Sequence, residues 1–299
     1  MYVLLKVAVV AFFALKQNNS IYIGKQGILR KILSEQGVKT MNQKLIPAVV
    51  GVALAIAITT TMDATGYSML SALPLFPLLG LFWYLQKFSR PEIGLIWGKP
   101  KAYVLALAYP FVVLSLIATI AALSGVVDTS NANWRNVAIN MSAGSSIGVI
   151  MLLLTEEGFF RGWLWAALQR AELTATQTLA WTTVAFVLWH ISAISLDTGF
   201  DIPLAEIPVF LVNATLIGTV FGLLRVISGS VLVPSVCHAV WNSIDYPLFG
   251  FGEKVGALGI TQTHIFGPEV GLLGIGFNLL FVVVLWAWWK RSGLAPQPG

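Results

Sequence analysis

Apolar residues form eight long runs along this chain, separated by short segments rich in charged and turn-forming residues. A membrane-spanning α-helix needs about 20 predominantly apolar residues, and the runs have roughly that length. The seventh run is the least regular, because polar residues occupy its middle. The pattern predicts an all-α, polytopic membrane bundle of about eight transmembrane helices. The predicted spans are Leu45–Met62, Leu70–Gln86, Ala102–Gly125, Ile147–Arg170, Thr174–Ser195, Ile207–Leu224, Val231–Gly250 and Pro268–Trp289.

The composition agrees with this pattern. Hydrophobic residues make up 57% of the chain and charged residues 10%, which is typical of polytopic membrane proteins. Cys237 is the only cysteine, so the sequence excludes an intramolecular disulfide and a cluster of thiolates around a metal. We find no internal repeat and no low-complexity tract. Residues 45–292 are therefore predicted to form a single transmembrane domain.

The basic excess of the chain indicates its orientation rather than a nucleic-acid partner. The loops Asp63–Met69, Leu196–Glu206 and Phe251–Gly267 carry only Lys254 between them. Lysine and arginine remain in the cytoplasm more often than not, so both termini are predicted to be cytoplasmic. The compact, loop-poor chain favours a prokaryotic plasma membrane. The basic residues at the predicted cytoplasmic positions are Lys16, Lys25, Arg30, Lys31, Lys39, Lys44, Lys87, Arg90, Lys99, Lys101, Arg170, Arg225, Lys290 and Arg291.

Residues 1–44 form a basic segment that two interpretations fit. Tyr2–Leu15 is apolar but too short to span a bilayer, and Lys6 interrupts it. The segment is either an interfacial anchor or sequence upstream of a genuine start at Met41. We favour the second interpretation.

Two adjacent carboxylates and an arginine lie inside the fourth apolar run. Ionised groups at membrane depth cost roughly 2.5–3.5 kcal/mol each on insertion scales, so they indicate a functional site. In an α-helix, Arg161 lies one turn beyond Glu157 and on the same face, where the two charges pair. Glu156 faces elsewhere and has no local partner. Glu156 is thus the candidate reactive group, and Glu157 with Arg161 the candidate site-ordering pair.

Two of the three histidines, His190 and His238, also lie in apolar runs, and Asn242 shares a helix face with His238. At about 1.5 Å per residue, Glu157 lies roughly 20 Å and His190 roughly 24 Å from the predicted cytoplasmic ends of their spans. His238 and Asn242 lie roughly 12–18 Å from theirs, so the groups can share one layer. Lipid cannot satisfy them, so they are predicted to face one another or an intramembrane polar cavity. We expect this set to include every deep titratable group in the second half of the chain.

The chemistry that fits such a cavity is hydrolysis. A carboxylate and an imidazole can take a proton from water and return it to a leaving amine. A second imidazole and an amide can stabilise an oxyanion. No serine or cysteine is placed as a nucleophile, which favours direct attack by water. Alternatively, Glu157–Arg161 is a purely structural pair, and the histidines are hydrogen bonds between helices or a proton relay in a transporter.

Three motifs in this order resemble the signature of the CAAX protease and bacteriocin-processing family, the type II CAAX prenyl endopeptidase-like or ABI proteins. The motifs are Glu156-Glu157-xxx-Arg161, Phe186-xxx-His190 and His238-xxx-Asn242, and the resemblance covers residues 147–246. It implies an eight-helix bundle with an intramembrane site that opens to the cytoplasmic side. It further implies that Glu156 and His190 activate water, that His238 and Asn242 hold the oxyanion, and that Glu157 and Arg161 order the site.

The resemblance implies an intramembrane peptidase acting on CAAX-type or bacteriocin-like peptides. The expected partners are a peptide or protein substrate, lipidated or not, and membrane lipids, with no nucleic acid. We favour catalysis without a metal; if zinc is bound, its ligands are Glu156, His190 and His238. The alternatives are a proton-coupled transporter and a non-catalytic immunity or scaffold protein.

Overall fold

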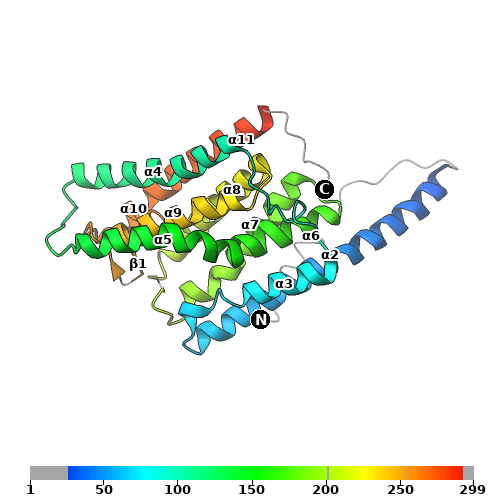
Figure 1. The fold of residues 1–299 in the computed structure, drawn as a ribbon, viewed down its shortest axis with the longest axis horizontal. Helices are drawn as coiled ribbons and strands as arrows, with labels where there is room; N and C mark the ends of the chain where they lie inside the picture. The colour runs from blue at the N-terminus through cyan, green and yellow to red at the C-terminus, as the bar shows by residue number, and fades with distance from the viewer. Residues whose placement is uncertain (1–25, 201, 253, 292–299) are drawn as a thin grey trace.

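The computed structural model is a bundle of helices with almost no strand, as the apolar pattern predicts (Figure 1). It describes residues 26–200, 202–252 and 254–291, with side chains from residue 43 onward. The helices are α2 (Gln26–Ala64), α3 (Leu75–Gln86), α4 (Pro100–Leu123), α5 (Trp134–Leu154), α6 (Trp165–Arg170), α7 (Ala175–Ser195), α8 (Ile207–Ser228), α9 (Leu232–Phe249), α10 (Thr263–Phe266) and α11 (Leu272–Arg291), with a 3₁₀ turn at Ser68–Leu70, a π-helix at Gly158–Leu164 and a two-stranded antiparallel hairpin of β1 (Gly250–Phe251) and β2 (Lys254–Val255).

Within the described residues, seven helical segments are long and apolar enough to cross a membrane. The predicted seventh span is the exception. It forms helix α9, but polar side chains such as His238, Asn242 and Asp245 keep its composition below that of a span. Because α9 packs against α4, α5 and α8, much of its surface faces protein rather than lipid. The protein is an integral membrane protein, and the polar side chains of α9 lie on a helix that packs against three others.

One predicted boundary is wrong. The fourth span begins at Trp134 rather than Ile147, while its end at Arg170 is as predicted. The mixed polar and apolar sequence near Asn140 hid this extension. The second span is confirmed as Ser68–Gln86; within it, the α-helix begins at Leu75, after the 3₁₀ turn and Pro74, since proline favours the start of a helix.

Helix α2 begins well before the first predicted span, at Gln26, and its membrane-spanning part is Gln43–Ala64. The apolar stretch Tyr2–Leu15 lies outside the described residues. The interpretations of that stretch therefore stay predictions.

A large apolar core forms where α4, α8, α9 and α11 meet. The rings of Tyr109 and Trp241 stack with centroids 5.0 Å apart. Polar groups inside this core are paired: the Tyr109 hydroxyl donates to Asn278 (2.7 Å), whose amide donates to Asn213 (3.0 Å). In a membrane such pairs contribute roughly 0.6 kcal/mol each and fix how the helices face one another.

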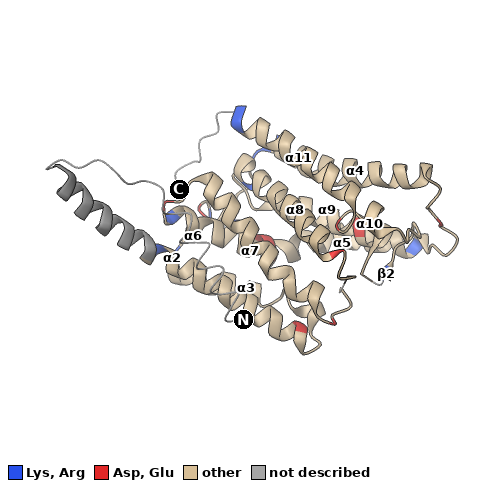
Figure 2. Ribbon diagram, turned by 180° about the vertical axis from the view of Figure 1, so that it is seen from behind, with Lys and Arg blue, Asp and Glu red and all other residues tan. Residues whose placement is uncertain are grey.

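Most of the described lysines and arginines lie at one end of the bundle, near α6 and the carboxyl end of α11 (Figure 2). We call this end the basic end. Residues 88–98 cross this end as a loop, the inner strap. Arg225 reaches the strap by donating to the Glu92 carbonyl (3.3 Å), and the Val231 amide donates to the Gly94 carbonyl (2.9 Å). A Cβ at Gly94 would lie 2.6 Å from the Arg225 guanidinium carbon. The backbone of the strap at Gly94 therefore packs directly against Arg225 and covers the basic end of the bundle.

We expect Gly94→Ala to destabilise the protein more than Gly66→Ala. Both glycines have positive φ, 77° and 82°, so either substitution costs about 1–2 kcal/mol of backbone strain. Only Gly94 has a neighbour for the new methyl group, and displaced Arg225 hydrogen bonds add about 1–3 kcal/mol. Thermal unfolding in detergent measures the difference, and equal melting temperatures would contradict the closure of the strap on Arg225.

Candidate functional site

The chain bends where the two glutamates stand. Thr155 ends α5 with φ −111° and ψ −102°, and its hydroxyl donates to the Met151 carbonyl (2.7 Å). A π-helix follows at Gly158–Leu164, a form that often marks functional sites. A Cβ at Gly158 would lie 2.1 Å from the Leu153 carbonyl oxygen, so only glycine fits this bend. The break separates α5 from α6 and places Glu156 and Glu157 at the join.

Glu157 lies at the centre of a buried ion group. Its Oε1 is 3.1 Å from Arg161 Nη1 and 3.0 Å from His238 Nδ1, and the side chains of Glu157 and Arg161 have no exposed area. Arg161 also donates to the Gly218 carbonyl of α8 (3.0 Å) and lies over the Phe186 ring of α7 (4.1 Å). One carboxylate thus connects the α5–α6 join to α9, and its arginine partner continues the contact to α7 and α8.

The contact with Glu157 determines how His238 can act. An ionised carboxylate only accepts hydrogen bonds, so Nδ1 of His238 must carry a proton. Nε2 of His238 is then the ring nitrogen that remains for contact with a substrate. The ring of Phe221 stacks on His238 with centroids 4.5 Å apart and fixes its plane.

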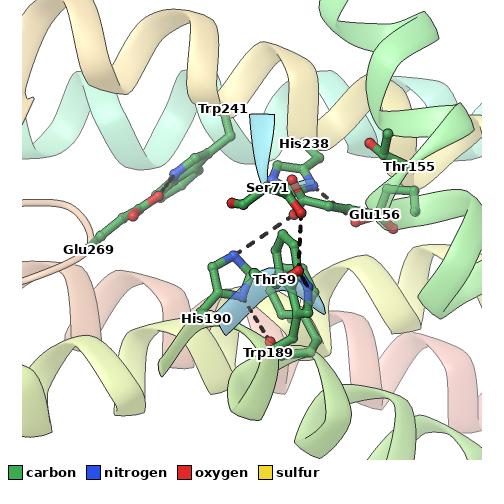
Figure 3. Close-up of polar contacts among 12 residues, drawn as sticks. Thr59, Ser71, Thr155, Glu156, Trp189, His190, His238, Trp241 and Glu269 are labelled. Carbon is green, nitrogen blue, oxygen red and sulfur yellow. Dashed lines mark hydrogen bonds and ion pairs between the residues drawn. The ribbon is translucent and has the colours of Figure 1, made fainter. Parts of the chain in front are cut away.

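Glu156 and His190 face each other across a short gap (Figure 3). His190 Nδ1 donates to the Phe186 carbonyl (2.8 Å), which leaves Nε2 as an acceptor in the neutral ring. Nε2 lies 3.8 Å from Glu156 Oε2, beyond hydrogen-bond length, and this oxygen is buried without a hydrogen bond from any described residue. Glu156 Oε2 and His190 Nε2 are therefore two hydrogen-bond acceptors that face each other with no donor from the described residues between them.

Asn242 lies one turn beyond His238 on α9 and lines a cavity of about 470 Å³ between α5 and α9. Gly144 and Gly148 of α5 form part of the opposite wall. Small residues allow the two helices to approach, and the hydroxyls of Ser145 and Ser243 are 2.7 Å apart. Asn242 thus faces space that another molecule can fill, whereas Glu157 and Arg161 are enclosed.

The predicted set of deep titratable groups is incomplete. Asp245 on α9 is buried with Oδ1 unpartnered, and Glu269 accepts a hydrogen bond from the indole of Trp241 (2.8 Å). Glu269 also lies within electrostatic range of His238 and Glu156. The spacing of seven residues from His238 to Asp245 is a helical signal that could have revealed Asp245. No sequence signal points to Glu269, because a loop brings it to the bundle.

The alternative zinc ligands are divided between two contacts. Glu156 faces His190, whereas His238 is held by Glu157. Over the described part of the chain, no three histidine, cysteine or acidic side chains are grouped closely enough to hold a metal ion. His264, predicted to lie on the surface, is exposed and takes no part in the site. Metal dependence stays a prediction.

A comparison with protein-family models finds one match, to "Type II CAAX prenyl endopeptidase Rce1-like", over residues 140–244. The matched stretch includes all of the predicted site residues. No curated protein and no solved structure matches the chain. The helical architecture and the family match agree with the resemblance that the three motifs suggested. Residues 140–244 of this integral membrane protein are thus similar to the type II CAAX prenyl endopeptidase Rce1-like family.

Proposed function

We propose that the protein is an intramembrane endopeptidase in which Glu156 and His190 activate a water molecule. The observation that carries the proposal is the pair of unsatisfied acceptors, Glu156 Oε2 and His190 Nε2, 3.8 Å apart. One water molecule can donate a hydrogen to each acceptor and keep a lone pair for attack. The family match supports a peptidase activity for such a site.

The reaction proceeds in two steps. The water oxygen bonds to the carbonyl carbon of the scissile peptide, its proton passes to the Glu156–His190 pair, and the carbonyl electrons form an oxyanion. The oxyanion then collapses, the carbon–nitrogen bond breaks, and the proton is returned to the leaving amine. His238 and the amide of Asn242 stabilise the oxyanion, where losing one donor costs roughly 2.7–4 kcal/mol.

The two adjacent glutamates take different roles because their surroundings differ. Glu157 is fully enclosed, and its Oε1 contacts both Arg161 Nη1 and His238 Nδ1, so it has no exposed area for a substrate to reach. The Glu156 side chain is 13% exposed and faces His190. In this proposal Glu157 and Arg161 order the site, and Glu156 carries the proton.

The proposed substrates are peptides or membrane-associated proteins, with CAAX-type proteins and bacteriocin-like peptides as the two candidate groups. A proton-coupled transporter or a non-catalytic immunity or scaffold protein would use the same buried groups without breaking a bond. Incubation of the purified protein with lipidated and unmodified peptides in H₂¹⁸O separates these functions. Hydrolysis places ¹⁸O in the newly formed carboxylate, and the absence of labelled fragments would contradict the proposal.

Glu156→Gln should lower peptide cleavage by roughly 10²–10⁴-fold, because the amide cannot accept the proton of the attacking water. The melting temperature in detergent should change little, because Oε2 makes no hydrogen bond with a described residue that the substitution removes. The matched control is Glu172→Gln, an exposed carboxylate paired with Lys44 outside the site, which should cleave normally. Cleavage by Glu156→Gln above a tenth of the parent rate would exclude Glu156 as the base.

Glu157→Ala should lose stability as well as activity. Removing one partner of a buried ion pair leaves the other charge uncompensated, at a cost of roughly 3–5 kcal/mol. The double substitution Glu157→Gln/Arg161→Met removes both charges and should recover part of the melting temperature but not the activity. If Glu157→Ala melts with the parent protein, the ordering role is wrong.

Catalysis without a metal predicts that prolonged treatment with 1,10-phenanthroline leaves cleavage unchanged. Two imidazoles and one carboxylate release zinc reversibly, so a strong chelator would remove a catalytic ion. Elemental analysis of the purified protein should find no stoichiometric zinc. Loss of activity that added zinc restores would instead identify Glu156, His190 and His238 as ligands.

A further inference from the structure

The end of α2 carries a buried carboxylate with no partner among the described residues. Asp63 is 2% exposed, and neither of its side-chain oxygens accepts a hydrogen bond from a described residue. No described lysine, arginine or histidine forms an ion pair with it. A buried carboxylate is costly unless it is paired, hydrogen-bonded or bound to a cation. The groups that surround Asp63 therefore indicate how its charge is satisfied.

Two hydroxyl groups on neighbouring segments are also buried without a partner. They are Ser68 Oγ, in the 3₁₀ turn that follows α2, and Ser192 Oγ, near the end of α7; neither hydrogen-bonds to a described residue. A serine inside a helix can satisfy its hydroxyl with the carbonyl of the preceding turn, as Ser235 does on α9. Ser192 makes no such bond, so its oxygen remains available to another group.

Helices α2 and α7 pack together and run in the same direction. Near the start of the spanning part of α2, Lys44 pairs with Glu172, in the turn before α7 (2.5 Å). Farther along, the indole of Trp189 on α7 donates to the Thr59 hydroxyl on α2 (2.7 Å), and this hydroxyl donates to the Ser71 carbonyl (3.0 Å; Figure 3). The two helices advance by nearly the same number of residues between these contacts, so equal steps beyond them reach the same level of the bundle.

The three unpartnered groups lie just beyond the contact at Thr59. Asp63 follows this contact by one turn of α2, about 6 Å along the axis, and Ser192 follows it by about 4.5 Å along α7. After α2 the chain turns back, and Ser71 returns to the level of Thr59. Ser68, three residues earlier, therefore lies beside the end of α2, where Asp63 is. The order of the chain and its contacts thus bring one carboxylate and two hydroxyl groups together.

We propose that Asp63, Ser68 and Ser192 bind one small monovalent cation, Na⁺, where α2, the 3₁₀ turn and α7 meet. Carboxylate and hydroxyl oxygens are hard ligands, and they suit hard cations rather than zinc. One carboxylate balances one positive charge, so Na⁺ leaves the buried group neutral, whereas Mg²⁺ or Ca²⁺ would leave a buried charge uncompensated. The ion stabilises the contact of α2 with α7 beside His190. The inference goes beyond the proposed peptidase function and does not rest on it.

The test is binding of ²²Na⁺ to the purified protein in detergent, together with its melting temperature in NaCl and in an equal concentration of choline chloride. We expect one Na⁺ per chain and a melting temperature roughly 2–5 °C higher in NaCl at about ten times the dissociation constant. Asp63→Asn removes the charge and should lose both responses. Ser192→Ala should weaken binding several-fold without abolishing it. The matched control is Asp197→Asn, at an exposed carboxylate just past α7, which should bind as the parent does.

Absence of saturable ²²Na⁺ binding by the parent chain would overturn the proposal, and so would equal melting temperatures in NaCl and choline chloride. Binding that Asp63→Asn retains would place the ion elsewhere and would overturn it as well. Should Asp63→Asn fail to fold, the response of the parent and its weakening in Ser192→Ala still decide the question. None of these measurements requires catalysis, so the cation site and the peptidase function fail separately.

Discussion

The buried carboxylate of Glu157 is the constraint on which the arrangement of this bundle depends. A lone charge in the membrane interior is costly, and Glu157 pairs with Arg161 on its own segment and accepts a hydrogen bond from His238 on α9. Arg161 in turn binds the backbone of α8 and the ring of Phe186 on α7. Since removing any one of these partners leaves a buried charge, the helices can meet in only a narrow range of geometries.

The same constraint gives two adjacent residues, Glu156 and Glu157, different surroundings. Glu157 is fully enclosed and contacts Arg161 and His238 through Oε1, whereas Glu156 is partly exposed and faces the acceptor nitrogen of His190. A site built in this way holds its proton-transfer groups on a rigid frame while leaving them free for water and substrate. The bend at Thr155 and the π-helix beyond it make the separation possible, because they turn neighbouring residues towards different surroundings.

Much of this could be predicted from the sequence, and the failures have physical causes. Apolar length identified most spans, and the spacing of four between Glu157 and Arg161 predicted their contact, because both signals are local along a helix. The hydrogen bond between Glu157 and His238 joins residues far apart in sequence, so helical periodicity could not predict it. Asp245 and Glu269 were missed, and helix α9 fell below the composition of a span, because burial against protein relaxes the demand for apolar side chains.

A double-mutant cycle between Glu157 and His238 tests most directly whether the buried carboxylate of Glu157 positions His238 for catalysis. Turnover would be measured for the parent, Glu157→Gln, His238→Asn and the double variant under conditions in which all four are folded. If Glu157 acts by orienting His238 through the hydrogen bond at Nδ1, the double variant should be no slower than the slower single variant. Additive losses in activation free energy would show that the two residues act independently and would contradict this account.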